Sequence, residues 1–123
     1  MEETVYALLR LGDAAPERLR RLSEKMRRVA CYAFGDTRRQ LEAVLKISEQ
    51  KRLIENQLYY REKLLKGLTD EEAELLMLRA RGVPSERAKE GRGYSARSVR
   101  RKTADAVRAA ENILYLLGYE SRL

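Results

Sequence analysis

The sequence has no histidine, no tryptophan and only one cysteine in 123 residues. A single cysteine cannot form a disulfide within the chain, and without histidine the chain cannot complete the four-ligand set of a structural zinc site. A glycine-rich phosphate loop, an activated serine or cysteine motif and a carboxylate pair at metal-ligand spacing are also missing. These absences predict a protein that is not an enzyme and that holds no metal and no cofactor.

Long apolar runs are absent as well. The first residues are Met1, Glu2 and Glu3, and no apolar stretch follows that is long enough for a secretory signal or a transmembrane helix. We therefore expect a cytoplasmic protein with no membrane partner. The lone Cys31 suits a reducing compartment, and its position beside an apolar stripe predicts that it is buried.

The few helix-breaking residues favour helix throughout. The chain has two prolines and seven glycines, and no window alternates polar with β-branched or aromatic residues as a strand would. The sequence therefore predicts an all-α fold. The expected architecture is a long helical hairpin or coiled-coil part over residues 1–66, followed by a helix-turn-helix domain with an extended last helix over residues 67–123.

The first 35 residues predict two helices. A weakly patterned short helix is expected to end at Gly12, and Pro16 then fits the first turn of the next helix, where its missing N–H costs nothing. Apolar residues spaced by three and four continue this second helix until Gly35 stops it.

A longer helix is predicted from Thr37 to Lys66. Asp36 or Thr37 can cap it, and its roughly 30 residues would span on the order of 45 Å. A helix of this length needs a packing partner, because isolated helices are marginal in water. That partner is either the preceding helix, folded back as a hairpin, or a second copy of the chain.

Three further helices are predicted after Gly67. Thr69 and Glu72 form a capping box at the start of the first, which ends at Gly82. A short segment begins at Pro84, and Ser95 caps the last helix. Apolar residues of that helix repeat at heptad-type spacing. The residues expected at contacts between copies of the chain are Leu41, Val44, Ile54 and Leu58 in the long helix and Ala110, Ile113 and Leu117 in the last helix.

The net charge of +7 is concentrated in one stretch. Between Arg79 and Arg108 there are ten basic and three acidic residues, whereas the rest of the chain balances to zero. A solvated helix face usually mixes its signs, so a one-sided excess indicates a phosphate-binding surface.

The predicted start of the last helix carries the side chains that this function needs. Val99 is expected to face the core, whereas Arg97, Ser98, Arg100 and Arg101 are expected to face outward. Arginine binds guanine O6 and N7 bidentately, and lysine and serine bind phosphate. The residues predicted to contact DNA are Ser95, Arg97, Ser98, Arg100, Arg101, Lys102, Arg92 and Lys89.

Several segments of this half resemble region four of bacterial sigma factors. They are Leu68–Arg79, Gly82–Val83 with Glu86, Gly93–Ser95 and Ser98–Arg100. The long, charged N-terminal part before such a region is similar to phage late-gene transcriptional regulators of the ArpU and RinA type. The resemblance implies control of phage or prophage genes by promoter binding, with Ser95, Arg97, Ser98, Arg100 and Arg101 at recognition-helix positions.

The chain departs from that family in the middle helix of the motif. The family usually has an isoleucine-alanine pair and then a leucine there, whereas here Ala88 is the one apolar residue and Arg92 replaces the leucine. These differences predict a second helix that is frayed, rotated or partly 3₁₀. Base-specific reading depends on a rigidly held recognition helix more than phosphate binding does.

The sequence favours a DNA-binding transcriptional regulator whose partners are double-stranded DNA, a second copy of the chain or a larger homo-oligomer, and RNA polymerase. Two alternatives stay open. One is a phage terminase small subunit, which also joins a helix-turn-helix to helical oligomerisation segments. The other is a helical protein–protein adaptor with a degenerate helix-turn-helix.

Overall fold

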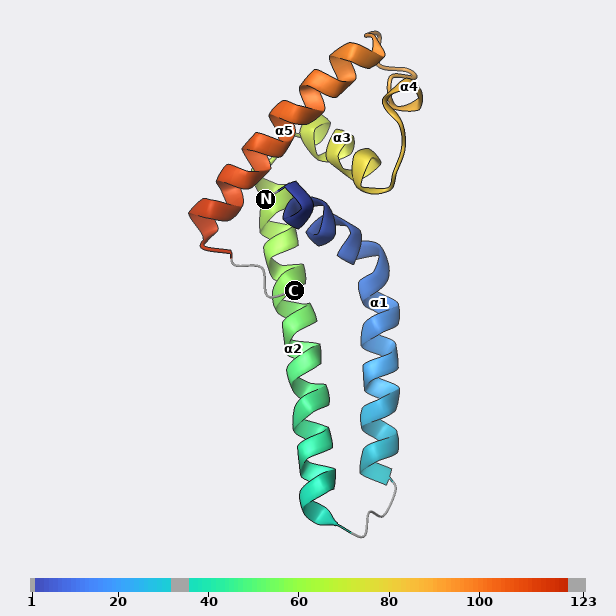
Figure 1. The fold of residues 1–123 in the computed structure, drawn as a ribbon, viewed down its shortest axis with the longest axis vertical. Coiled ribbons are helices and arrows are strands. Elements are labelled where there is room, and N and C mark those ends of the chain that lie inside the picture. Colours follow the sequence, from blue (N-terminus) through green and yellow to red (C-terminus); the bar gives the residue numbers. More distant parts are fainter. Residues whose placement is uncertain (1, 32–35, 120–123) are drawn as a thin grey trace.

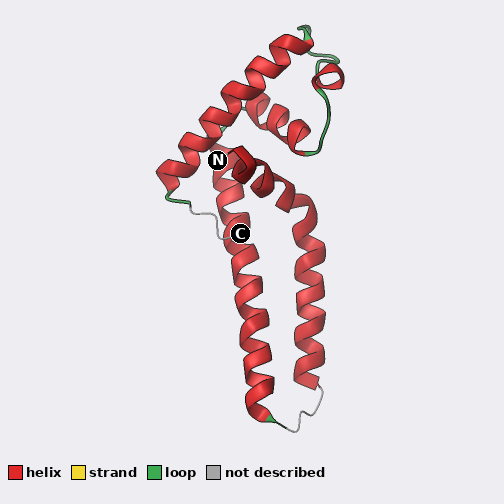
Figure 2. Ribbon diagram, in the orientation of Figure 1, coloured by secondary structure: helices red, strands yellow, loops and turns green. Residues whose placement is uncertain are grey.

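The computed structural model describes residues 2–31 and 36–119, and those residues fold into helices joined by short turns (Figures 1 and 2). No strand occurs within these ranges, so the predicted all-α class is confirmed. The helices are α1 (Glu2–Cys31), α2 (Thr37–Gly67), α3 (Asp70–Ala80), α4 (Ser85–Ala88) and α5 (Ala96–Leu117).

The molecule has a stalk and a head. The stalk consists of residues 17–31 of α1 and 37–56 of α2, which run antiparallel beside each other (Figure 1). The head contains the first half of α1, the last three turns of α2 and all of α3, α4 and α5. The hairpin alternative for α2 is therefore the one that the structure shows, with α1 as its partner within the chain.

The prediction of two helices before residue 36 is wrong, because α1 continues through both Gly12 and Pro16. Proline lacks the N–H that would donate to the carbonyl of Gly12, and such a missing bond kinks a helix without necessarily ending it. Figure 1 shows α1 changing direction in its first half. The bend lets residues 2–15 lie across the head while residues 17–31 follow α2. Gly35, predicted to stop this helix, lies outside the described residues.

One main core joins the two predicted parts of the chain. Its largest fully buried side chains are Leu9, Leu64, Leu76 and Leu114, one each from α1, α2, α3 and α5. Residues 1–66 and 67–123 therefore share their interior, and the boundary near residue 66 is not a boundary in packing.

A second, smaller core holds α3, α4 and α5 together. Leu75, Ala88 and Val99 are buried against one another, and Leu78, Val83 and Tyr94 pack around them. Val99 is 2% exposed, which confirms its predicted inward orientation. This core fixes the start of α5 to α3 through a single turn of α4.

The predicted helix starts are confirmed by their hydrogen bonds. The Asp36 carboxylate accepts from the backbone N–H of Arg38 at 3.0 Å. Thr69 and Glu72 form the reciprocal capping box at α3. Each bond satisfies an N–H that the helix itself leaves free.

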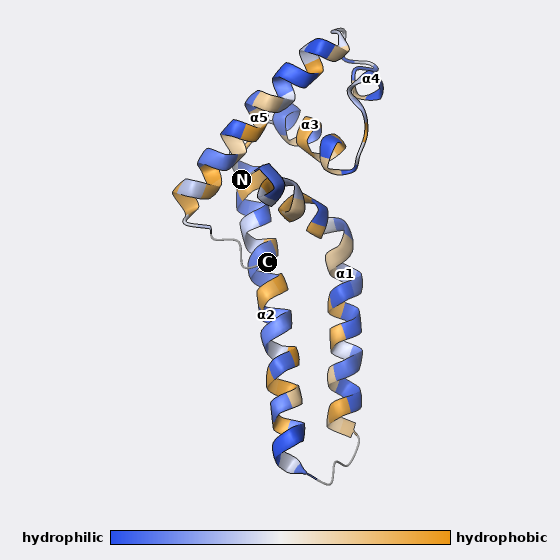
Figure 3. Cartoon of the chain, in the orientation of Figure 1, coloured by the Kyte–Doolittle hydropathy of each residue, from blue (hydrophilic) through white to orange (hydrophobic). Residues whose placement is uncertain are grey.

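The stalk buries little. Within its described residues only Ile47 is fully buried, while Leu41 is 59% and Leu45 67% exposed. Apolar residues recur along both stalk helices among hydrophilic ones (Figure 3). Two helices alone cannot enclose a core, which is why the prediction that Cys31 is buried is wrong: it is exposed at the last residue of α1.

The residues predicted for contacts between copies have different surroundings. Leu41 is exposed, Leu117 is 38% exposed, and Val44, Ile54 and Leu58 are half-buried. Ile113 packs against the main core. Ala110 is fully buried in the main core, so it offers no surface to a second copy and its predicted role there is corrected.

Candidate nucleic-acid interface

The candidate interface begins at the N-terminus of α5. Ser95 is the N-cap, and its Oγ accepts from the backbone N–H of Ser98 at 3.2 Å, as predicted. No acidic residue lies in the first turn. The partial positive charge of the helix terminus therefore meets no carboxylate in that turn, which favours an anion.

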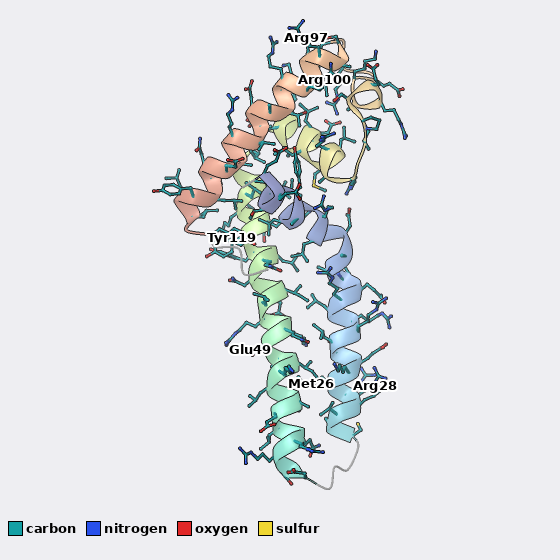
Figure 4. The ribbon with its side chains drawn as sticks, viewed as in Figure 1. Met26, Arg28, Glu49, Arg97, Arg100 and Tyr119 are labelled. Atoms are coloured by element: carbon teal, nitrogen blue, oxygen red, sulfur yellow. The ribbon has the colours of Figure 1, made fainter. Side chains whose placement is uncertain are left out.

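Three exposed arginines surround this helix start. Arg97, Arg100 and Arg101 are exposed as predicted, whereas Ser98 is half-buried. Figure 4 shows Arg97 and Arg100 at the end of the molecule farthest from the stalk residues Met26 and Arg28. Among the described residues, none of the three arginines forms an ion pair. Their guanidinium groups therefore retain their hydrogen-bonding capacity.

A fourth arginine extends this surface along α5. Arg97, Arg101 and Arg108 follow one another at spacings of four and seven, which places them on one face of the helix. Arg97 and Arg108 are separated along the axis by roughly 16 Å. Arg108 is 79% exposed at its side chain, with a long 3.7 Å pair to Asp105. Arg108 is missing from the predicted site, although its heptad spacing from Arg101 was a usable signal.

Lys89 and Arg92 are not part of this group of arginines. The Lys89 ammonium pairs with Glu86 at 3.0 Å. The Arg92 side chain is only 13% exposed, because its guanidinium turns inward onto the Ala88 carbonyl and the Glu74 carboxylate. The hydrogen bond to Glu74 raises the pKa of Arg92 above its usual value.

Lys102 is also engaged within the chain. Its ammonium lies 4.8 Å from the centre of the Tyr94 ring and 3.5 Å from the Glu71 carboxylate. The structure thus brings Ser95, Arg97, Arg100 and Arg101 together at one end of α5 and places Lys102 on the flank nearest α3. The sequence signal that Arg92 and Lys102 are engaged within the chain was the pair of acidic residues Glu71 and Glu74, one turn apart on α3.

A groove with a partly apolar lining adjoins two of the arginines of α5, Arg100 and Arg108. It has a volume of about 410 Å³ and lies between α1, α3, α4 and α5. Leu75, Val83 and Val107 are among its apolar lining residues, and Arg79 and Arg100 line it as well. The groove therefore offers apolar contacts beside basic residues, and the acidic Glu2 and Glu111 also line it.

The second helix of the predicted helix-turn-helix is short, as expected. α4 is one turn, Ser85–Ala88, with no side-chain cap at Pro84. Gly91 and Gly93 follow it, each with φ of +75°.

Comparison with family models, curated proteins and solved structures gives no match to this chain. The resemblance to sigma-factor region four therefore depends on its motif residues alone. A search of the described residues finds no helix that is long and apolar enough to cross a membrane.

Proposed function

We propose that this protein binds double-stranded DNA through the first turns of α5. The observation that carries the proposal is the group of Arg97, Arg100 and Arg101, exposed and without ion pairs among the described residues, at a serine-capped helix start. Phosphate binding requires cations that are not already neutralised within the protein. The seven excess positive charges between residues 79 and 108 support the same function.

In the proposed complex α3, α4 and α5 act as a helix-turn-helix. The small core around Val99 holds α5 while its N-terminal end enters the major groove. Arg97, Arg100 or Arg101 reaches guanine edges, and the free N–H groups of the first turn bind phosphate. Arg108, farther along α5, contacts the phosphate backbone of the DNA.

The biological role that we propose is transcriptional regulation of the phage or prophage type, with RNA polymerase as a further partner. This role follows from the resemblance of Leu68–Arg79 and Gly93–Arg100 to sigma-factor region four. A homodimer suits it, because two copies double the phosphate contacts and fix the spacing of two half-sites. The exposed Leu41 and Leu45 of the stalk support pairing of two copies.

Fluorescence anisotropy with a labelled duplex of random sequence tests the proposal. We expect a Kd below about 10 µM at low salt, which weakens steeply as salt is raised because counterions are released. Absence of salt-dependent binding would contradict the proposal, since even non-specific binders reach roughly 10⁻⁴–10⁻⁶ M at physiological salt.

A second candidate is a protein–protein adaptor that uses the same head. The groove lined by Leu75 and Val107 favours it, because an apolar segment with an acidic residue placed beside Arg100 suits such a surface. Pull-down with RNA polymerase and DNA binding, measured on the same variant, together distinguish the two functions. Replacement of Arg100 and Arg101 by alanine would, for an adaptor, abolish capture and leave DNA binding unchanged.

A further inference from the structure

The loop before α5 is held to α3 by polar contacts. Arg92 lies between Gly91 and Gly93, both in the left-handed region. Its Nε donates to the Ala88 carbonyl at 2.6 Å, and its Nη2 donates to the Glu74 carboxylate at 2.5 Å. One side chain therefore ties the last turn of α4 to α3.

A second set of contacts reaches the same face of α3 one turn earlier. The Tyr94 hydroxyl donates to the Glu71 carboxylate, and the Lys102 ammonium lies 3.5 Å from that carboxylate. Lys102 also lies over the Tyr94 ring, at a cation–π distance of 4.8 Å. Glu71 thus holds both the residue before the N-cap and a residue in the second turn of α5.

Apolar packing alone is a weak support for α5 at this point. α4 supplies only Ala88 to the small core, whereas a leucine or isoleucine would fill a larger volume beneath the helix. The two carboxylates of α3 engage cations that would otherwise be available to an anionic ligand. Their contacts join the loop, α3 and α5 at the end that carries Arg97.

We propose that Glu71, Glu74, Arg92, Tyr94 and Lys102 form a polar clasp that positions the N-terminal end of α5 and withholds Arg92 and Lys102 from phosphate. Each of the five is a positioning residue. The first part of this inference concerns the free protein, and the second part depends on the proposed DNA binding. In the clasp the α3 carboxylates take the place of phosphate oxygens, so the contacts with DNA are left to the outward arginines.

Hydrogen exchange without DNA tests the positioning. We expect Glu71→Gln, Glu74→Gln and Tyr94→Phe each to speed amide exchange over residues 91–98 severalfold, on the order of fivefold, with little change in Tm. Tyr94→Phe keeps the ring and removes only the hydroxyl. The matched control is Glu90→Gln in the loop before α5. It removes the same charge as Glu71→Gln or Glu74→Gln, and among the described residues it breaks no side-chain contact. Unchanged exchange relative to this control overturns the clasp.

The salt dependence of binding to a random-sequence duplex tests the withholding. Glu71→Gln frees Lys102, so the slope of log K against log salt is expected to steepen by about one relative to Glu90→Gln. Equal slopes for the two variants overturn that part of the inference. If the wild-type protein binds no DNA, the proposed function fails, whereas the exchange experiment still decides whether the clasp positions α5.

Discussion

The guanidinium of Arg61 in α2 lies directly against Gly12 in α1. Arg61 Nε donates to the carbonyl of Leu9 at 3.2 Å, and Nη2 lies 3.8 Å from the sulfur of Met77 in α3. A Cβ on residue 12 would overlap the guanidinium itself. Arg61 therefore joins three helices where the stalk meets the head, and Gly12 leaves the space for it.

Gly12→Ala is expected to destabilise the protein by about 1 kcal/mol. The added methyl group displaces Arg61 from the Leu9 carbonyl. The protein then loses a charge-assisted hydrogen bond, which typically contributes about 1.5–3 kcal/mol. The higher helix propensity of alanine offsets up to about 1 kcal/mol of that loss. Urea unfolding gives the difference in the free energy of unfolding.

The same substitution in an Arg61→Met background serves as its control. Without the guanidinium there is no clash, so Gly12→Ala should there stabilise the protein by several tenths of a kcal/mol through helix propensity alone. If Gly12→Ala has the same sign in both backgrounds, then Arg61 is not the reason for glycine at this position.

Local rules predicted most of the helices. The caps at Asp36, Thr69 and Ser95 follow from side chains that reach their own backbone, so they are readable from sequence. The continuity of α1 through Pro16 was not readable, because the head packs against residues before the proline and supports a bent helix. A proline alone does not distinguish a bend from an end.

The candidate site was predictable to a similar degree. Outward arginines follow from the 3.6-residue period once Val99 is placed in the core. The inward turn of Arg92 was not predictable, since it depends on Glu74, eighteen residues earlier in the chain. Charge counting treats every cation alike and cannot tell which ones the fold neutralises.

Loss of two outward arginines should weaken DNA binding more than loss of two equally charged stalk residues. Arg97→Ala with Arg101→Ala is expected to reduce affinity on the order of tenfold to a hundredfold and to lower the salt slope by about two. The control is Arg27→Ala with Arg28→Ala, two exposed arginines of α1. Equal weakening by both double variants, measured by anisotropy, would indicate a general charge effect and no defined interface.

Residues 67–123 should not fold without the first 66 residues. A fragment of residues 67–123 lacks Leu9 and Leu64, which are fully buried beside Leu76 and Leu114. Truncation of one such leucine to alanine costs roughly 2–5 kcal/mol, against a total stability of about 5–15 kcal/mol. Circular dichroism of the fragment is expected to show little helix and no cooperative melting. A cooperative transition like that of the whole chain would show that residues 67–123 form an independent domain.

The ion pairs of Glu17 predict a defined pH dependence. Hydrogen bonds from Arg20, together with the charges of Arg20 and Arg21, lower the pKa of Glu17 from 4.5 to about 2. A carboxylate with a lowered pKa in the folded state stabilises the protein above its unfolded pKa, and this contribution is lost as pH falls. The difference in the free energy of unfolding between the wild type and Glu17→Gln should be constant above about pH 5.5 and shrink between 4.5 and about 2. Denaturant unfolding across this range measures it, and a difference that grows on acidification would contradict the assignment.

Pairing of two copies through the stalk predicts a specific effect of Leu41 and Leu45. Both are more than half exposed, so replacement of both by glutamine should leave the stability of the single chain within about 0.5 kcal/mol. Burial of a leucine in an interface contributes roughly 1.5–3 kcal/mol, and the dimer Kd should therefore rise on the order of tenfold or more. Light scattering over a range of protein concentrations measures the change.

Leu116→Gln, at an 82% exposed position near the end of α5, is the control. A monomeric wild-type chain, or equal loss of mass in the control, would contradict stalk pairing, and a ring of eight or more copies would favour DNA packaging over regulation.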